Sequence, residues 1–250
     1  MVSSPSVTTI RLAPVRSSMN IAPGGWKYAF VFLLAAPFAF LFSIGASLLL
    51  LALGAGALAF FRDPERTPPP TGVVSPADGT VSVLREDGGH VRLGVFMNVW
   101  HVHVVRAPFA GAVTDLEHVS GANRPAFSKE SDRNERVHVE LETNSPELPS
   151  VDLESNPIED GSDTAGPKTD GEASDATVTL IAGAFARRIF PYVEPGDDLE
   201  RGDRLGHIAF GSRVDLVFPP SVDPDDLAVE PGDSVTAGET VVFDSHSVGD

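Results

Sequence analysis

The feature that most restricts the fold is an uncharged, mostly apolar run of 34 residues, from Tyr28 to Phe61. A core helix of a soluble protein would show a polar face, and this run has none. As one straight helix it would be ~51 Å long, whereas the hydrocarbon core of a bilayer is ~30 Å thick. Pro37 and the segment Ser43-Ile44-Gly45 offer places where the chain can turn. The run therefore predicts a membrane anchor over residues 26–61, built as a hairpin of helices that is either two-pass or re-entrant.

Basic residues flank this run on both sides, with Lys27 before it and Arg62 and Arg66 after it. By the positive-inside rule both ends would be cytoplasmic, which places the remaining chain on the cytoplasmic side of the cell membrane. The alternative is a secretory signal peptide, but its apolar region should be only ~7–15 residues long. Residues 1–25 lack periodicity and are interpreted as a flexible tail, in which Met19 is an alternative start to Met1.

Acidic residues are confined to the part of the chain after Arg62. All 35 Asp and Glu residues lie from Asp63 onward, and the net charge is −17. A chain of this charge is repelled by nucleic acid, so nucleic acid is excluded as a partner. The same pattern suits a protein that stays soluble in strong salt and indicates a halophilic source. Cysteine is absent, which excludes disulfides, thiolate catalysis and Cys-ligated zinc.

Residues 72–250 have the patterns of a mainly β domain, and residues 62–71 precede it as a linker kept extended by three successive prolines. The segment Val91–Val105 is typical of a buried strand, and Val137–Leu141 alternates like a strand with one exposed face. Residues 144–176 hold nine acidic residues and almost no large apolar ones. They cannot bury enough surface to fold, which predicts a disordered acidic insertion between two strands.

A short repeat near the C-terminus gives the β domain a more specific shape. The run Val193-Glu194-Pro195-Gly196-Asp197 recurs as Val229-Glu230-Pro231-Gly232-Asp233, and a second Gly follows each copy. The pattern is typical of the small flattened barrels of lipoyl and biotinyl carriers, in which Gly and Asp build turns. It predicts a compact β-barrel or sandwich core with lipoyl-like hairpins. A non-enzymatic carrier or interaction module stays open as an alternative, although neither Lys129 nor Lys168 lies in a hairpin tip as a carrier requires.

Two of the seven histidines, His101 and His103, lie two residues apart and would share one face of a strand. Such a pair could begin the zinc site of a membrane-tethered peptidase. Zinc needs at least one further ligand, and the sequence supplies none at a suitable spacing. We therefore expect no metal and keep the zinc peptidase as an alternative enzyme class.

The pair Gly211-Ser212 permits a different chemistry, because no G-x-S-x-G elbow of a serine hydrolase surrounds it. A serine hydroxyl can attack the carbonyl of the preceding residue and turn the amide into an ester. Glycine leaves that carbonyl uncrowded. Elimination from the ester cuts the chain and converts the serine into a pyruvoyl group, whose ketone can form a Schiff base with an amine and act as an electron sink.

From about Trp26 to Pro219 the chain resembles the short form of the phosphatidylserine decarboxylase family, including its archaeal relatives. The motifs that carry the resemblance keep the family's order: Phe60-Phe61-Arg62-Asp63-Pro64-Glu65-Arg66, Ser75-Pro76-Ala77-Asp78-Gly79, Val102-His103-Val104, Arg106-Ala107-Pro108, Asn134-Glu135-Arg136, Ile181-Ala182-Gly183, Ala186-Arg187-Arg188-Ile189 and Phe210-Gly211-Ser212-Arg213-Val214-Asp215. The resemblance implies a self-processing, pyruvoyl-dependent carboxy-lyase that converts a serine phospholipid into the ethanolamine phospholipid and CO2. The acidic composition makes archaetidylserine a substrate candidate beside phosphatidylserine, and the lipid tail, ester or ether, stays open.

The resemblance also implies roles for single residues. Ser212 would yield the pyruvoyl group, and cutting the bond after Gly211 would give a β chain of residues 1–211 and an α chain of residues 212–250. His103 matches a histidine used in decarboxylation, which we interpret as the acid that protonates the carbanion. Asp78 matches an aspartate of self-processing. Arg106 stands where longer members have a second histidine, and we interpret it as binding the lipid phosphate or carboxylate. The base for self-cleavage and the oligomeric state, a homodimer included, stay open.

Overall fold

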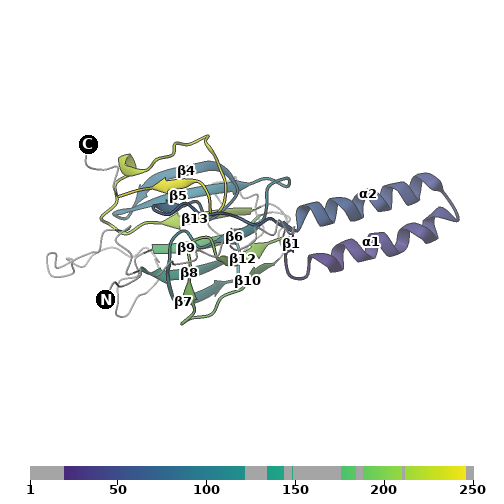
Figure 1. The fold of residues 1–250 in the computed structure, drawn as a ribbon, viewed down its shortest axis with the longest axis horizontal. Helices are drawn as coiled ribbons and strands as arrows, with labels where there is room; N and C mark the ends of the chain where they lie inside the picture. The colour runs from purple at the N-terminus through teal and green to yellow at the C-terminus, as the bar shows by residue number, and fades with distance from the viewer. Residues whose placement is uncertain are drawn as a thin grey trace, which may run out of the picture.

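The computed structural model describes residues 20–121, 134–143, 148, 176–183, 188–209 and 212–245. Two helices project from one end of a β domain (Figure 1). The prediction of a mainly β core preceded by a hydrophobic helical hairpin is therefore confirmed. The predicted tail lies outside the described residues up to residue 19, and the acidic insertion 144–176 does so except for Leu148 and Ala176.

The hairpin consists of α1 (Gly25–Phe40) and α2 (Ile44–Phe60), and the chain turns at residues 41–43. Ser43 caps α2, because its Oγ accepts a hydrogen bond from the amide of Ala46 at 3.3 Å. Pro37 lies inside α1 and does not form the turn. Within the described residues, the structure contains no helix with the combined length and apolarity needed to cross a membrane.

The root of the hairpin is fixed to the β domain by pairing and packing. Strand β1 (Asn20–Ile21) pairs with β2 (Arg62–Asp63), so the chain segments before α1 and after α2 lie side by side. The first residues of the predicted linker therefore form a strand. A small apolar cluster joins the root to the β domain; it contains Ala22, Phe60, Phe61, Val102, Val104 and Ala209. The two helices are thus attached to the end of the β domain where residues 102–104 lie.

An antiparallel sheet of eight strands forms most of the β domain, in the order β11-β7-β8-β9-β13-β5-β4-β14. Its strands are β4 (Gly79–Asp87), β5 (His90–Met97), β7 (Gly111–Val119), β8 (Arg136–Glu142), β9 (Ala176–Ala182), β11 (Asp198–Leu199), β13 (Ser212–Val217) and β14 (Ser234–Val235). The sheet is curled like half of a barrel. Residues 137–141 form a strand as predicted, and Val137, Val139 and Leu141 join the core. The expected exposed face is wrong, because His138 is half-buried and Glu140 is buried.

Smaller elements close the open side of this sheet. A three-stranded sheet has the order β10-β12-β6, and a two-stranded one joins β15 to β3. Their bounds are β3 (Val73–Val74), β6 (Val104–Arg106), β10 (Ile189–Pro191), β12 (Arg204–Ile208) and β15 (Val241–Phe243), and a short 3-10 helix, η2, covers Pro224–Asp226. Val105, Leu205 and Ile208 from this layer are fully buried in the main core.

The repeated Pro-Gly-Asp segments form the turns that the sequence predicts. In both copies the aspartate Oδ2 accepts a hydrogen bond from the amide of the residue before the proline, at 2.8 Å for Asp197 and 2.9 Å for Asp233. The intervening Gly196 and Gly232 have φ of 96° and 106°, which the third position of a type II turn requires. A third copy, Glu200 to Asp203, makes the same bond at 2.8 Å. Sequence analysis missed it because arginine replaces the proline.

Candidate active site

Ser212 is the first residue of β13, a strand at the middle of the main sheet. It pairs with Met97 at the end of β5 and with Ala182 at the end of β9. Its side chain points to the same face as Val214 and Leu216, which belong to the core. The residue is 0% exposed, and its Oγ has no hydrogen-bond partner among the residues that the structure describes. Gly211, the predicted cleavage site, lies outside the described residues.

His103 lies just before β6 and is also buried. Its Nδ1 is 3.0 Å from the carbonyl oxygen of His101, whereas its Nε2 has no partner in the described part of the chain. A carbonyl can only accept, so this contact puts the proton on Nδ1 and leaves Nε2 as a buried lone pair. Burial lowers the pKa of His103 to about 4, although the hydrogen bond to the His101 carbonyl acts to raise it. The imidazole is therefore neutral near pH 7.

Backbone pairing brings Ser212 and His103 to the same end of the β domain. Met97, the partner of Ser212 in β5, is followed by a turn that leads to His103. The carbonyl of His103 in turn accepts a hydrogen bond from the amide of Ile208 at 3.2 Å, four residues before Ser212. This end carries the hairpin, since Phe60 of α2 lies against His103 with ring centroids 4.3 Å apart.

A small apolar pocket lies at this junction and contains a second histidine that sequence analysis missed. Its lining comes from the hairpin root, β6 and β12: Ala22, Phe60, Phe61, Arg62, His103, Val104 and His207. His207 is held on both sides, because Phe190 stacks on it at 4.6 Å and the Tyr192 hydroxyl lies 2.6 Å from its Nδ1. Burial lowers the pKa of His207 to about 4 and raises that of Tyr192. Tyr192 then donates to Nδ1, which leaves the Nε2–H of His207 as a donor.

Asp78 lies between β3 and β4 and is bound on two sides. Its Oδ1 and Oδ2 are 3.0 and 2.8 Å from Nη2 of Arg66, and Oδ1 accepts the amide of Ala237 at 2.8 Å. Thr80, two residues later, pairs with Phe96, the neighbour of the residue that pairs with Ser212. Asp78 therefore lies near the same end of the strands as Ser212, and β5 separates its strand β4 from β13. Its predicted role in self-processing stays a prediction.

Arg106 is buried, and its guanidinium is occupied by protein acceptors. Nη1 donates to the carbonyl of Gly202 at 2.8 Å, and Nη2 donates to Asp63 Oδ1 at 2.8 Å and to the carbonyl of Pro64 at 2.9 Å. The other oxygen of Asp63 accepts from Nε of Arg204. Asp63, expected to be part of a linker, is thus a buried carboxylate that ties β2 to β6 and β12. The predicted binding of a lipid headgroup by Arg106 stays a prediction.

Replacing Asp63 by asparagine should destabilise the fold by about 3 kcal/mol or more, because it leaves the buried Arg106 charge uncompensated. Urea unfolding followed by circular dichroism measures the loss. The matched control is Glu65→Gln, since Glu65 is half exposed and lies 3.9 Å from Arg204. That change should cost less than about 1 kcal/mol. Equal effects of the two substitutions would show that Asp63 does not hold the junction together.

The alternative of a zinc site finds no further ligand in the structure. Nδ1 of His101 accepts the amide of Asn98 at 3.0 Å, and His103 turns its own Nδ1 to the carbonyl of His101. Over the described ranges there is no group of three His, Asp or Glu side chains arranged to hold a metal ion.

Comparison with known proteins relates this arrangement to one family. The model of the phosphatidylserine decarboxylase family matches residues 53–148 and 164–243. A protein of Halobacterium salinarum, provisionally named an archaetidylserine decarboxylase proenzyme, is 48% identical over 221 residues, which cover 88% of this chain and 96% of that protein. The phosphatidylserine decarboxylase proenzyme of Streptomyces griseus is 43% identical over 190 residues, or 76% of this chain and 74% of that protein. A relative in Methanopyrus kandleri, also provisionally named an archaetidylserine decarboxylase proenzyme, is 37% identical over 240 residues, covering 89% and 98%.

Proposed function

This chain belongs to the phosphatidylserine decarboxylase family and is a decarboxylase, and we propose that it is a self-processing, pyruvoyl-dependent enzyme acting on a serine phospholipid. The names of the relatives support the substrate and the self-processing, because these proteins are named as decarboxylases of serine lipids and as proenzymes. Phosphatidylserine and archaetidylserine carry the same serine headgroup, so the reaction is the same for either. The products are the ethanolamine phospholipid and CO2.

The observation that carries the proposal is the buried hydroxyl of Ser212, which has no hydrogen-bond partner in the part of the chain that the structure describes. Buried hydroxyls normally find a hydrogen-bond partner, and leaving one without costs free energy. A serine that is to become a pyruvoyl group has no need of a lasting partner, because its oxygen leaves it during processing. An acceptor for the hydroxyl proton is also present at this end of the β domain, since Nε2 of His103 is a buried lone pair without a partner in the described residues.

Self-cleavage needs a base, and we assign that role to His103. Nε2 takes the proton as the Ser212 oxygen attacks the carbonyl of residue 211, and the amide becomes an ester with a free amine on residue 212. Removal of the Cα proton of residue 212 then breaks the ester C–O bond and releases the carboxylate of residue 211. Water replaces the nitrogen of the resulting dehydroalanine as ammonia and leaves a ketone. Arg106 cannot take this part, because an arginine stays protonated at neutral pH.

For the decarboxylation, a pyruvoyl group derived from Ser212 would supply an electron-withdrawing ketone able to condense with the amine of the headgroup. His103 then delivers a proton to the carbon that has lost CO2. Its low pKa opposes protonation in the empty pocket, but the phosphate of a bound lipid carries a negative charge that favours the imidazolium. Phe60 and Phe61 line the pocket and keep water from that carbon.

The hairpin of residues 25–60 is the proposed membrane anchor, with the β domain on the cytoplasmic side. Its exposed apolar side chains run along both helices and include Phe30, Leu34, Phe42 and Leu48. Water does not solvate such a surface well, whereas a lipid bilayer does. The end of the β domain with Ser212 and His103 is the end from which the hairpin projects, so a lipid headgroup has a short path to the site.

Intact-mass spectrometry of the purified protein tests the proposal. We expect two chains, of residues 1–211 and 212–250, with the second blocked to Edman sequencing because its N-terminus is a ketone. Sodium borohydride should reduce that ketone and abolish the activity. A single uncut chain with an unmodified serine, in a preparation that turns the lipid over, would contradict the proposal.

A further inference from the structure

The turn between β5 and β6 holds two exposed apolar side chains, Val99 and Trp100. They are 54% and 65% exposed, and every other large exposed apolar side chain in the described residues lies on the hairpin. The turn is well braced, since the Asn98 side chain accepts the amide of Val99 at 2.8 Å and His101 donates its amide to the carbonyl of Asn98 at 2.9 Å. The turn therefore exposes two neighbouring apolar side chains to solvent while its backbone is held by hydrogen bonds.

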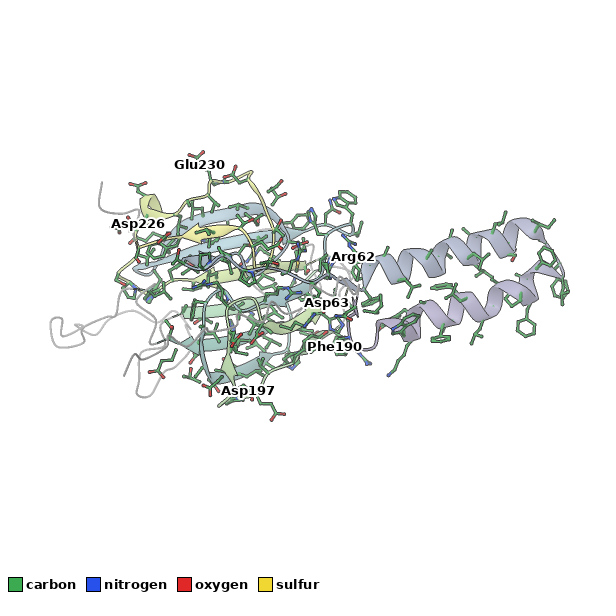
Figure 2. The ribbon with its side chains drawn as sticks, viewed as in Figure 1. Arg62, Asp63, Phe190, Asp197, Asp226 and Glu230 are labelled. Carbon is green, nitrogen blue, oxygen red and sulfur yellow. The ribbon has the colours of Figure 1, made fainter. Side chains whose placement is uncertain are left out.

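One arginine joins this turn to the root of the hairpin. Arg62 donates from Nη1 to the carbonyl of Ala59 in α2 and from Nη2 to the carbonyl of Trp100, both at 2.6 Å. Figure 2 shows Arg62 and the buried Asp63 where the helices leave the β domain, while Asp197, Asp226 and Glu230 lie on other sides of it. The exposed apolar pair of the β domain is therefore next to the apolar hairpin.

We propose that Val99 and Trp100 form a second membrane contact, which enters the headgroup region of the same leaflet as the hairpin. This inference rests on the proposed role of the hairpin as an anchor. Tryptophan favours the interface, where its ring meets hydrocarbon and its N–H meets water. A chain of net charge −17 gains nothing from attraction to anionic lipids, so insertion of apolar side chains has to supply the binding. A bilayer of zwitterionic lipid is accordingly the partner that this surface fits.

A second contact changes what the anchor can do. A hairpin alone leaves the β domain free to tilt against the membrane surface, whereas a second contact beside the hairpin limits that tilt. The turn also contains His101, whose carbonyl sets the tautomer of His103. Seating Trp100 in the membrane therefore holds the segment that carries the proposed base next to the lipid headgroups.

The two tryptophans of the chain, Trp26 at the hairpin and Trp100 on the turn, allow each contact to be read separately. The full-length Trp26→Phe variant reports only Trp100, and Trp100→Phe reports only Trp26. Each is mixed with phosphatidylcholine vesicles that carry bromine at defined depths of the acyl chains. We expect the emission of Trp100 to shift to shorter wavelength and to be quenched most by the shallowest bromines.

The outcomes separate this inference from the proposed anchor. If Trp26 is quenched and the protein floats with the vesicles while Trp100 stays unquenched, the second contact is wrong and the anchor stands. If neither residue is quenched and the protein does not float, both are wrong. A functional test uses the double change Val99→Ser and Trp100→Ser, which should raise KM for substrate in vesicles on the order of tenfold. The ratio of that KM to the one for detergent-dispersed lipid should rise with it, and an unchanged ratio would overturn the inference.

Discussion

Replacing Ser212 by alanine should leave one uncut chain of 250 residues without decarboxylase activity. The change removes the atom that attacks the preceding carbonyl and the source of the ketone. Since Oγ has no hydrogen-bond partner in the described structure, its removal strands no other group, and stability should be equal or slightly higher. Gel electrophoresis, intact mass and CO2 release from labelled lipid measure the three expectations.

A matched control for this variant is Ser82→Ala on β4, where the hydroxyl donates to the carbonyl of Gly94 at 3.2 Å. That protein should be cut and active. Cleavage of the Ser212→Ala chain at the same position, or decarboxylation by it, would rule out Ser212 as the source of the reactive group. A Ser212→Ala chain that is uncut but unfolded would be recognised by its circular dichroism.

Replacing His103 by glutamine should slow self-cleavage by about 10²–10⁴-fold, the usual contribution of a positioned base. Glutamine keeps a polar group of similar reach but cannot take a proton. Pulse-chase labelling of newly made chains measures the rate. The control is His118→Gln, because the His118 side chain is half exposed and its Nε2 lies 3.0 Å from Glu135 Oε1, away from Ser212. Equal cleavage rates in the two variants would mean that another group serves as the base.

The lowered pKa of His103 gives this prediction a pH profile. The neutral imidazole persists down to about pH 4, so cleavage in the wild-type protein should be insensitive to pH from 8 to about 5 and fall below that. The sign for stability follows from the same shift. The unfolded chain binds the proton near pH 6.5 and the folded one only near 4, so stability should fall as pH drops through this interval. His103→Gln should reduce that slope.

The sequence predicted the elements that depend on local chemistry. The apolar run became the helical hairpin because nothing in it can face water, and the Pro-Gly-Asp segments became turns because Gly196 and Gly232 accept a positive φ. The ordered motifs led to the family and to Ser212. Each of these predictions used residues that are neighbours in the chain.

What the sequence did not predict depends on residues that are far apart in the chain. His207 is 104 positions after His103, and only the pairing of β12 with β6 brings them to one pocket. Asp63 was expected in an extended linker, because the partners that bury it, Arg106 and Arg204, come from two later strands. Phe60 was assigned to the membrane, yet its ring covers His103. One signal for the role of Asp63 was present in the sequence, because Asp63 is the first acidic residue of the chain and directly follows the apolar run.

The central position of β13 has a consequence for the life of the protein. A cut before Ser212 would free the start of β13, which is hydrogen-bonded to β5 on one side and to β9 on the other. In the same product, β14 and β15 would stay paired with β4 and β3. The two products would remain interlaced, although nothing covalent joins them. Folding of the intact chain is unimolecular, but reassembly of separated chains depends on their concentration. Maturation would thus turn a reversible folding equilibrium into a one-way step, and the mature enzyme would persist through slow unfolding and not through refolding.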